Sequence, residues 1–107
     1  MLDDTSKNIL EFLDNIIKCC EIHNVNIQEV FAKHPNLSYF TLFRKCFNIP
    51  SSELKNIIEK LDLLYENDFI DTKMDSTYFT TQCIYERLNT EGSKSFLTES
   101  GKALLEN

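Results

Sequence analysis

The chain has 107 residues, enough for one domain with one hydrophobic core, and 42% of them are hydrophobic, which argues against disorder. No apolar run approaches the ~20 residues needed to span a bilayer, and the acidic start is unlike a signal peptide. Four cysteines without a sign of secretion predict a cytoplasmic protein with reduced thiols. The net charge of −6 argues against strong nucleic-acid binding, which draws much of its affinity from neutralising phosphates.

The first predicted element is a helix over residues 6–22, capped by Asp4, Thr5 or Ser6. Its apolar residues cover more than half of its circumference, a broader stripe than a helix on one small domain usually buries. This breadth is explained either by a partner subunit or by packing that stays within the chain. Because closed two-fold dimers are the commonest oligomers, we expect a homodimer. The residues predicted to form its interface are Ile9, Phe12, Leu13 and Ile16.

Two helices joined by a tight turn are predicted next, after a short helix over residues 26–34. Ser38 is expected to cap a helix over 38–47, and the break at 48–50 contains a proline, which lacks the N–H that a helix needs. A second helix over 51–66 is expected to restart at Ser51 or Ser52. Such a pair is typical of a helix-turn-helix unit, whose second helix enters the DNA major groove in many proteins.

The rest of the chain is predicted to form a β-hairpin and a final helix. Residues 69–73 and 77–88 are rich in β-branched and aromatic residues, and a turn signal at 89–92 precedes a return strand at 95–97. Thr98 is expected to cap a C-terminal helix that runs to Leu105.

The order of these elements resembles the winged-helix DNA-binding family. The segment FLTESGKALLE, from Phe96 to Glu106, is similar to the "LT-E-x-G-x-x-LL" element that closes the wing in the MarR and PadR groups of bacterial regulators. The resemblance covers residues 25–107 and implies a mainly α fold with a small β-hairpin. Residues 1–24 would then be an added N-terminal helix on a single winged-helix domain.

If the second helix enters a groove, Asn56 would pair with an adenine edge and Lys55 with guanine or phosphate. The cations form no clean basic stripe, because Lys55 and Lys60 alternate with Glu53 and Glu59. The alternative is a solvated face with an ordinary i,i+4 pair between Lys55 and Glu59. The residues predicted to contact DNA are Arg44, Lys45, Ser52, Lys55, Asn56, Lys60, Arg87 and Lys94.

We expect no catalysis, no metal and no cofactor. Cys19 and His23 would share a helix face, but zinc sites usually pair cysteines as C-x2-C, and no such pair is present. The adjacent Cys19 and Cys20 leave a thiol redox switch open. Cys46 and Cys83 lie in apolar segments and are expected to be buried as small hydrophobes.

The sequence therefore predicts a DNA-binding transcriptional regulator of winged-helix type. The alternative is a non-enzymatic module on the same fold that binds a protein partner or mimics DNA through its acidic surface. The first function needs a positive surface around the second helix and the wing, and the second needs a negative one.

Overall fold

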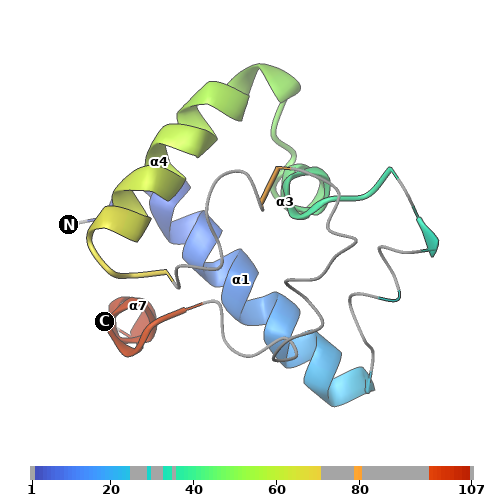
Figure 1. Cartoon of the computed structure of the whole chain (residues 1–107), viewed down its shortest axis with the longest axis horizontal. Helices are drawn as coiled ribbons and strands as arrows, with labels where there is room; N and C mark the ends of the chain where they lie inside the picture. The colour runs from blue at the N-terminus through green and yellow to red at the C-terminus, as the bar shows by residue number, and fades with distance from the viewer. Residues whose placement is uncertain are drawn as a thin grey trace.

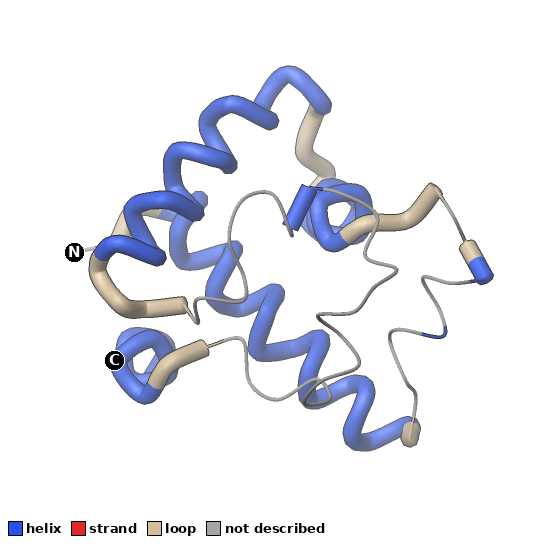
Figure 2. The backbone as a smooth tube through the Cα atoms, in the orientation of Figure 1, coloured by secondary structure: helices blue, strands red, loops and turns tan. Residues whose placement is uncertain are grey.

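The structure, a computed structural model, describes residues 2–24, 29, 33–34, 36–70, 79–80 and 97–106. This part of the chain is mainly helical (Figures 1 and 2). Its helices are α1 (Asp4–His23), α3 (Tyr39–Phe47), α4 (Leu54–Glu66) and α7 (Glu99–Glu106), with one 3₁₀ turn, η1 (Ser51–Glu53), directly before α4. None of these helices has the length and apolar character that crossing a membrane requires.

The helix α1 lies at the centre of this assembly. It contacts α3, α4 and α7, and Figure 1 shows it crossing the molecule with the other three around it. The broad apolar stripe of α1 is explained by these contacts, because the helix packs against three neighbours rather than one. Instead of being added beside a separate module, α1 supplies much of the core. The buried apolar side chains are Ile9, Leu10, Phe12, Leu13, Tyr39, Phe40, Phe43, Ile57, Leu61, Leu64, Ile70, Phe79 and Leu97.

The residues predicted to form a dimer interface are covered within their own chain. Ile9 and Leu13 are fully buried, Phe12 is 4% exposed, and Ile16 packs half-buried against the same core. Packing within the chain, the alternative explanation of the broad stripe, accounts for these side chains. A homodimer stays a prediction, but Ile9, Phe12 and Leu13 are not free to form its interface, and only Ile16 of the four is partly exposed.

Aromatic rings fill the space between α1 and α3. The ring of Phe12 meets that of Phe43 edge to face, with centroids 5.4 Å apart, and the ring of Phe79 lies 6.1 Å from Phe12 and 5.9 Å from Phe43. Such edge-to-face pairs add to the free energy gained by burial alone. Phe79 and Thr80 are helical, so the strand predicted over 77–88 is wrong at these two residues, and the rest of it lies outside the described residues. Of the two, Phe79 is fully buried in the aromatic core, so its packing there outweighs the strand preference on which the prediction depended.

The cap of α3 confirms the predicted start of the helix over 38–47. The hydroxyl of Ser38 accepts a hydrogen bond from the amide of Thr41 at 3.1 Å, and the hydroxyl of Thr41 accepts one from the amide of Ser38 at 2.8 Å. This reciprocal arrangement is a capping box, with threonine in the place usually taken by Glu or Gln. The helix ends at Asn48, whose left-handed backbone (φ 53°) suits asparagine.

Two other predicted caps are wrong. The carboxylate Oδ1 of Asp3 accepts a hydrogen bond from the amide of Ser6 at 2.7 Å, so Asp3 caps α1 and the helix begins at Asp4. Neither Ser51 nor Ser52 caps α4. Instead the 3₁₀ turn η1 follows Pro50, and the amide of Leu54 donates a hydrogen bond to the carbonyl of Ser51. This bond satisfies one of the backbone amides that are unpaired at the start of a helix and that a side-chain cap would otherwise bind. The predicted end of the second helix at residue 66 is confirmed.

The C-terminal helix α7 is fixed to the segment that follows α4. The Thr98 hydroxyl donates a 2.6 Å hydrogen bond to the carbonyl of Asp68 and accepts one from the amide of Gly101 at 3.0 Å, so the prediction that Thr98 caps α7 is confirmed. Next to it, Ile70 and Leu97 form an isolated antiparallel β-bridge. These two residues belong to the strands predicted over 69–73 and 95–97. Most of the predicted hairpin between them lies outside the described residues.

Gly101 allows the close approach between α7 and this segment. A Cβ atom at position 101 would lie 2.0 Å from the carbonyl oxygen of Phe69, which is part of the backbone. This is the physical reason for a glycine in the TESG segment.

We expect Gly101→Ala to destabilise the fold by roughly 1–3 kcal/mol, the usual range for overpacking a buried site. In an open helix the same change would stabilise by about 1 kcal/mol, so the sign of the effect tests the contact. Urea unfolding measures it, with the exposed neighbour Ser100→Ala as the control. A Gly101→Ala protein as stable as the unmodified chain would contradict the close approach.

We also expect Phe12→Ala to cost about 3–5 kcal/mol, because it removes a ring from the centre of the aromatic core. Phe12→Glu should unfold the chain, which circular dichroism would detect, whereas Asn15→Ala on the exposed side of α1 should change little. A folded, monomeric Phe12→Glu protein from a dimeric parent would instead support the predicted dimer interface.

Candidate functional site

The N-terminal end of α4 presents the polar side chains predicted to read DNA. Ser52 and Lys55 are exposed, and Asn56 is half-buried. Lys45 is exposed near the end of α3, on the other side of the turn. These four residues lie on α3, η1 and α4, the two helices and the short connection that the sequence predicted as a helix-turn-helix unit.

Arg44, in contrast, is used by the turn itself. Its Nε donates a 3.0 Å hydrogen bond to the carbonyl of Ile49, and its guanidinium carbon lies 5.7 Å from the centre of the Phe40 ring. A cation over an aromatic face is attracted to it. Arg44 therefore fixes the connection between α3 and α4. The sequence gives no signal for this role, because the acceptor is a backbone carbonyl whose position only the turn geometry determines.

Lys60 is likewise engaged within the chain. Its Nζ lies 2.6 Å from Oδ2 of Asp3, which joins α4 to the start of α1. The lysine, followed by the amide of Ser6, lowers the pKa of Asp3 from 3.8 to about 2. Sequence reasoning missed this pair, since 57 positions separate residues 3 and 60 and no local pattern links them.

The neighbours of Asn56 and Lys55 also differ from what was expected. The Asn56 side chain donates a 3.3 Å hydrogen bond to the carboxylate of Glu53, so an adenine would compete with an acidic neighbour. Lys55 forms no ion pair with Glu59. The predicted i,i+4 pair between Lys55 and Glu59, which was part of the solvated-face alternative, is therefore absent. Arg87 and Lys94 lie outside the described residues.

The expected absence of a metal site is tested only for part of the chain. Among the side chains that the structure describes, no group of three or more His, Cys, Asp or Glu could hold an ion. The side chains of Cys19, Cys20 and His23 on α1, and all of residue 83, lie outside that description. Cys46 is a free, exposed thiol, so the prediction that it is buried is wrong. It follows the last buried side chain of α3, Phe43, by almost one turn and lies beyond the edge of the core.

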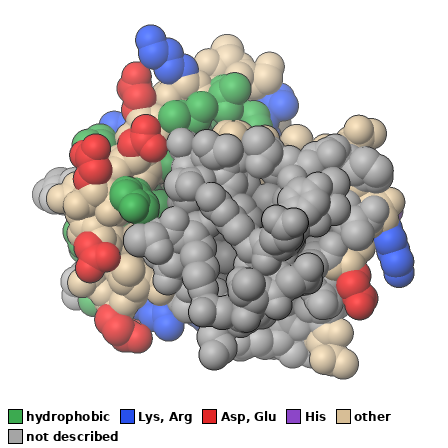
Figure 3. Space-filling model, in the orientation of Figure 1, with side chains coloured by type: hydrophobic (Ala, Val, Ile, Leu, Met, Phe, Trp, Pro, Cys, Tyr) green, Lys and Arg blue, Asp and Glu red, His purple; other side chains and the backbone are tan. Residues whose placement is uncertain are grey.

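Charge is segregated along the helix-turn-helix unit. Residues 44–56 carry Arg44, Lys45 and Lys55 against Glu53, whereas residues 59–68 carry four acids against Lys60. The exposed acids of the second segment are Glu59, Asp62, Glu66 and Asp68. Figure 3 shows acidic side chains spread over the side of the molecule where α4 lies, with hydrophobic side chains between them. The two ends of α4 therefore suit ligands of opposite charge.

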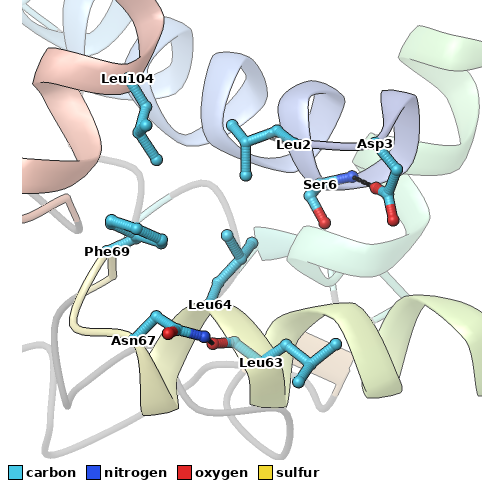
Figure 4. A pocket seen from close by; sticks show the side chains of 8 residues that line it. All are labelled: Leu2, Asp3, Ser6, Leu63, Leu64, Asn67, Phe69 and Leu104. Atoms are coloured by element: carbon cyan, nitrogen blue, oxygen red, sulfur yellow. Dashed lines mark hydrogen bonds between the residues drawn. The ribbon is translucent and has the colours of Figure 1, made fainter.

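An open hollow of about 400 Å³ lies beside the acidic end of α4, where the start of α1, the end of α4 and α7 meet (Figure 4). Its apolar wall consists of Leu2, Leu63, Leu64, Phe69 and Leu104. Its polar residues are Asp3, Ser6 and Asn67. Three distant segments of sequence contribute to it, which is why no local motif announces it.

No protein-family model, no curated protein and no solved structure matches the chain. The geometry of its own side chains is therefore the basis for a function.

The Asp3–Lys60 pair should make stability depend on pH. Because the folded pKa of Asp3 is about 2 and its ordinary value is 3.8, the stabilisation is complete only above about pH 5 and is lost as the pH falls through about 2. The Asp3 side chain is 45% exposed, so solvent screening limits the ion pair to about 1 kcal/mol or less.

We expect Asp3→Asn, which can still cap α1, to be less stable at pH 7 by that small amount, with most of the deficit gone at pH 2, where the Asp3 carboxyl is about half protonated in the folded protein. Asp3→Ala should lose about 1 kcal/mol more, because it also removes the cap. Urea unfolding at both pH values measures these differences, with the exposed neighbour Asp4→Asn as the control. A deficit of Asp3→Asn that persists at pH 2 would show that the ion pair is not its cause.

Proposed function

We propose that this chain is a non-enzymatic DNA-binding regulator of winged-helix type, and that it inserts the N-terminal end of α4 into the major groove. The observation that carries the proposal is the exposure of Ser52, Lys55 and the edge of Asn56 at the start of the second helix of a helix-turn-helix unit. In proteins that bind DNA with this unit, the N-terminal residues of the second helix contact the base edges. The N-terminal end of a helix also attracts phosphate.

The segment after α4 is consistent with a wing. The bridge between Ile70 and Leu97 joins the first and last parts of the predicted hairpin, as the base of a wing would. In this proposal Arg87 and Lys94 lie on the hairpin between them and reach the phosphate backbone or the minor groove. The motif at residues 97–101 supports the same proposal, because it fixes the residues that would follow the hairpin to the segment after α4.

The contacts of Arg44 and Lys60 reduce the set of cations available to DNA. Arg44 stabilises the turn and Lys60 pairs with Asp3, so the proposal assigns phosphate contacts to Lys45, Lys55, Arg87 and Lys94. About four phosphate contacts per chain give a modest affinity that falls roughly a hundredfold between 50 and 200 mM salt. Base contacts by Asn56 and Lys55 would supply about 1–3 kcal/mol of discrimination each.

A protein-binding or DNA-mimicking function is the second candidate. The acids on the C-terminal half of α4 favour it, because they repel phosphate and suit a basic partner. The two functions need not compete, since they use opposite ends of the helix.

We expect Lys45→Glu and Lys55→Glu each to weaken duplex binding about tenfold, whereas Lys60→Ala should change it little. Fluorescence anisotropy at low salt measures this, with random duplex and with DNA from upstream of the protein's own gene. Lys18→Glu is a charge-matched control, because Lys18 lies on α1 and pairs with Asp14. If no duplex binds at about 50 mM salt and ~50 µM protein, conditions that favour phosphate contacts, DNA binding is excluded.

A further inference from the structure

We propose that the hollow at the C-terminal end of α4, together with its acidic surroundings, is a docking site for a basic segment of a protein partner that inserts one apolar side chain. This inference does not rest on DNA binding, because it uses other residues at the other end of the helix.

The hollow needs an apolar occupant rather than a polar one. Two of its three polar residues have side-chain partners within the chain: Asp3 caps α1 and pairs with Lys60, and the Asn67 side chain donates a 2.8 Å hydrogen bond to the carbonyl of Leu63. The third, Ser6, is 6% exposed. Figure 4 shows Leu2, Leu64, Phe69 and Leu104 with their side chains around the space between the helices. A cavity of about 400 Å³ falls within the ~300–1,000 Å³ typical of sites that bury a ligand.

The edge of the hollow exposes apolar surface. Leu63 is 49% exposed while it lines the hollow, so one leucine side chain connects the cavity with the outer face of α4. The end of α4 thus combines a pocket with an exposed apolar edge. In protein interfaces, a side chain that fills such a pocket on its partner contributes much of the binding free energy.

The surroundings of Leu63 define the charge of the partner. The residues four before and three after it, Glu59 and Glu66, share its face of the helix, and both are exposed. Asp62 is exposed beside them. An apolar spot ringed by carboxylates attracts a segment in which lysine or arginine flanks a large apolar residue.

Other occupants fit less well. Nucleic acid and anionic lipid would bring negative charge to these acids. A second copy related by two-fold symmetry would place the same acids against one another, because such an interface uses the same patch on both subunits. The chain carries a net charge of −6, which adds to this repulsion.

The experiment is a selection of random 12-residue peptides, displayed on phage, against the full chain. The enriched peptides should share one large apolar residue flanked by lysine or arginine. Synthetic copies of these peptides should bind the Leu63→Ser and Glu66→Lys variants about tenfold more weakly than they bind the unmodified chain. The first variant removes the apolar edge of the hollow, and the second reverses a charge that attracts the peptide. Glu53→Lys makes the same charge change at the opposite end of α4 and should leave peptide affinity within about twofold.

Both substituted side chains are exposed, so the variants should melt at the temperature of the unmodified chain, and this is measured first. If Leu63→Ser does not fold, the proposal is tested by comparing the peptide affinity of Glu66→Lys with that of Glu53→Lys. Peptides without a basic consensus, equal binding to all variants, or no enrichment would each overturn the proposal. So would sedimentation showing a dimer of the chain that Leu63→Ser dissociates, which would assign the site to a second copy.

Discussion

The burial of α1 on three sides is the constraint on which the rest of the structure depends. Its ring at Phe12 meets Phe43 of α3, and its polypeptide contacts both α4 and α7. A chain of this length buries only a limited fraction of its surface when it folds. A central helix that packs against all the others lets them share one hydrophobic core. The orientation of α4, and so of both faces that it presents to solvent, follows from this packing.

Two sets of contacts then hold the two ends of α4. Before it, Arg44 donates to the carbonyl of Ile49 and fixes the connection between α3 and α4. At the other end, Thr98 and Gly101 attach α7 to the segment after α4. The polar residues that remain exposed are therefore displayed on a helix held at both ends, which limits the entropy lost when a ligand binds.

Local signals predicted much of the fold, while tertiary contacts determined most of the site. The Ser38 cap, the end of α4 and the Thr98 cap were predictable, because each depends on residues within one turn. The role of α1 was not, since its apolar breadth fits a partner subunit as well as three neighbours in the same chain. The prediction for Cys46 failed for a related reason: helical periodicity places it on the apolar face but cannot show where the core ends.

The candidate DNA contacts show the same division. Ser52 and Lys55 are exposed as the pattern predicted. Lys60, by contrast, lies in the same helix and carries the same charge as Lys55, yet it faces Asp3 from the distant N-terminus. Sequence spacing identifies which side of a helix a cation occupies, but only the packing of α1 against α4 identifies its partner. The hollow beside Leu63 depends on that packing as well.

Charge segregation along α4 also determines how strongly its two ends influence each other. Residues 55 and 63 are separated by eight positions, which corresponds to about 12 Å along a helix. At physiological salt the Debye length is about 8 Å, so charges near residue 63 are largely screened from a ligand at residue 55, whereas Glu59, about 6 Å along the helix from Lys55, is not. At 0.01 M salt the Debye length is about 30 Å, and all the acids at 59–66 then lie within range of a phosphate at the other end. A basic segment bound over those acids would reduce their repulsion, and it would strengthen DNA binding mainly at low ionic strength. By linkage the DNA would strengthen the binding of the segment by the same factor. Because this coupling is electrostatic, it requires no movement of α4 within the core.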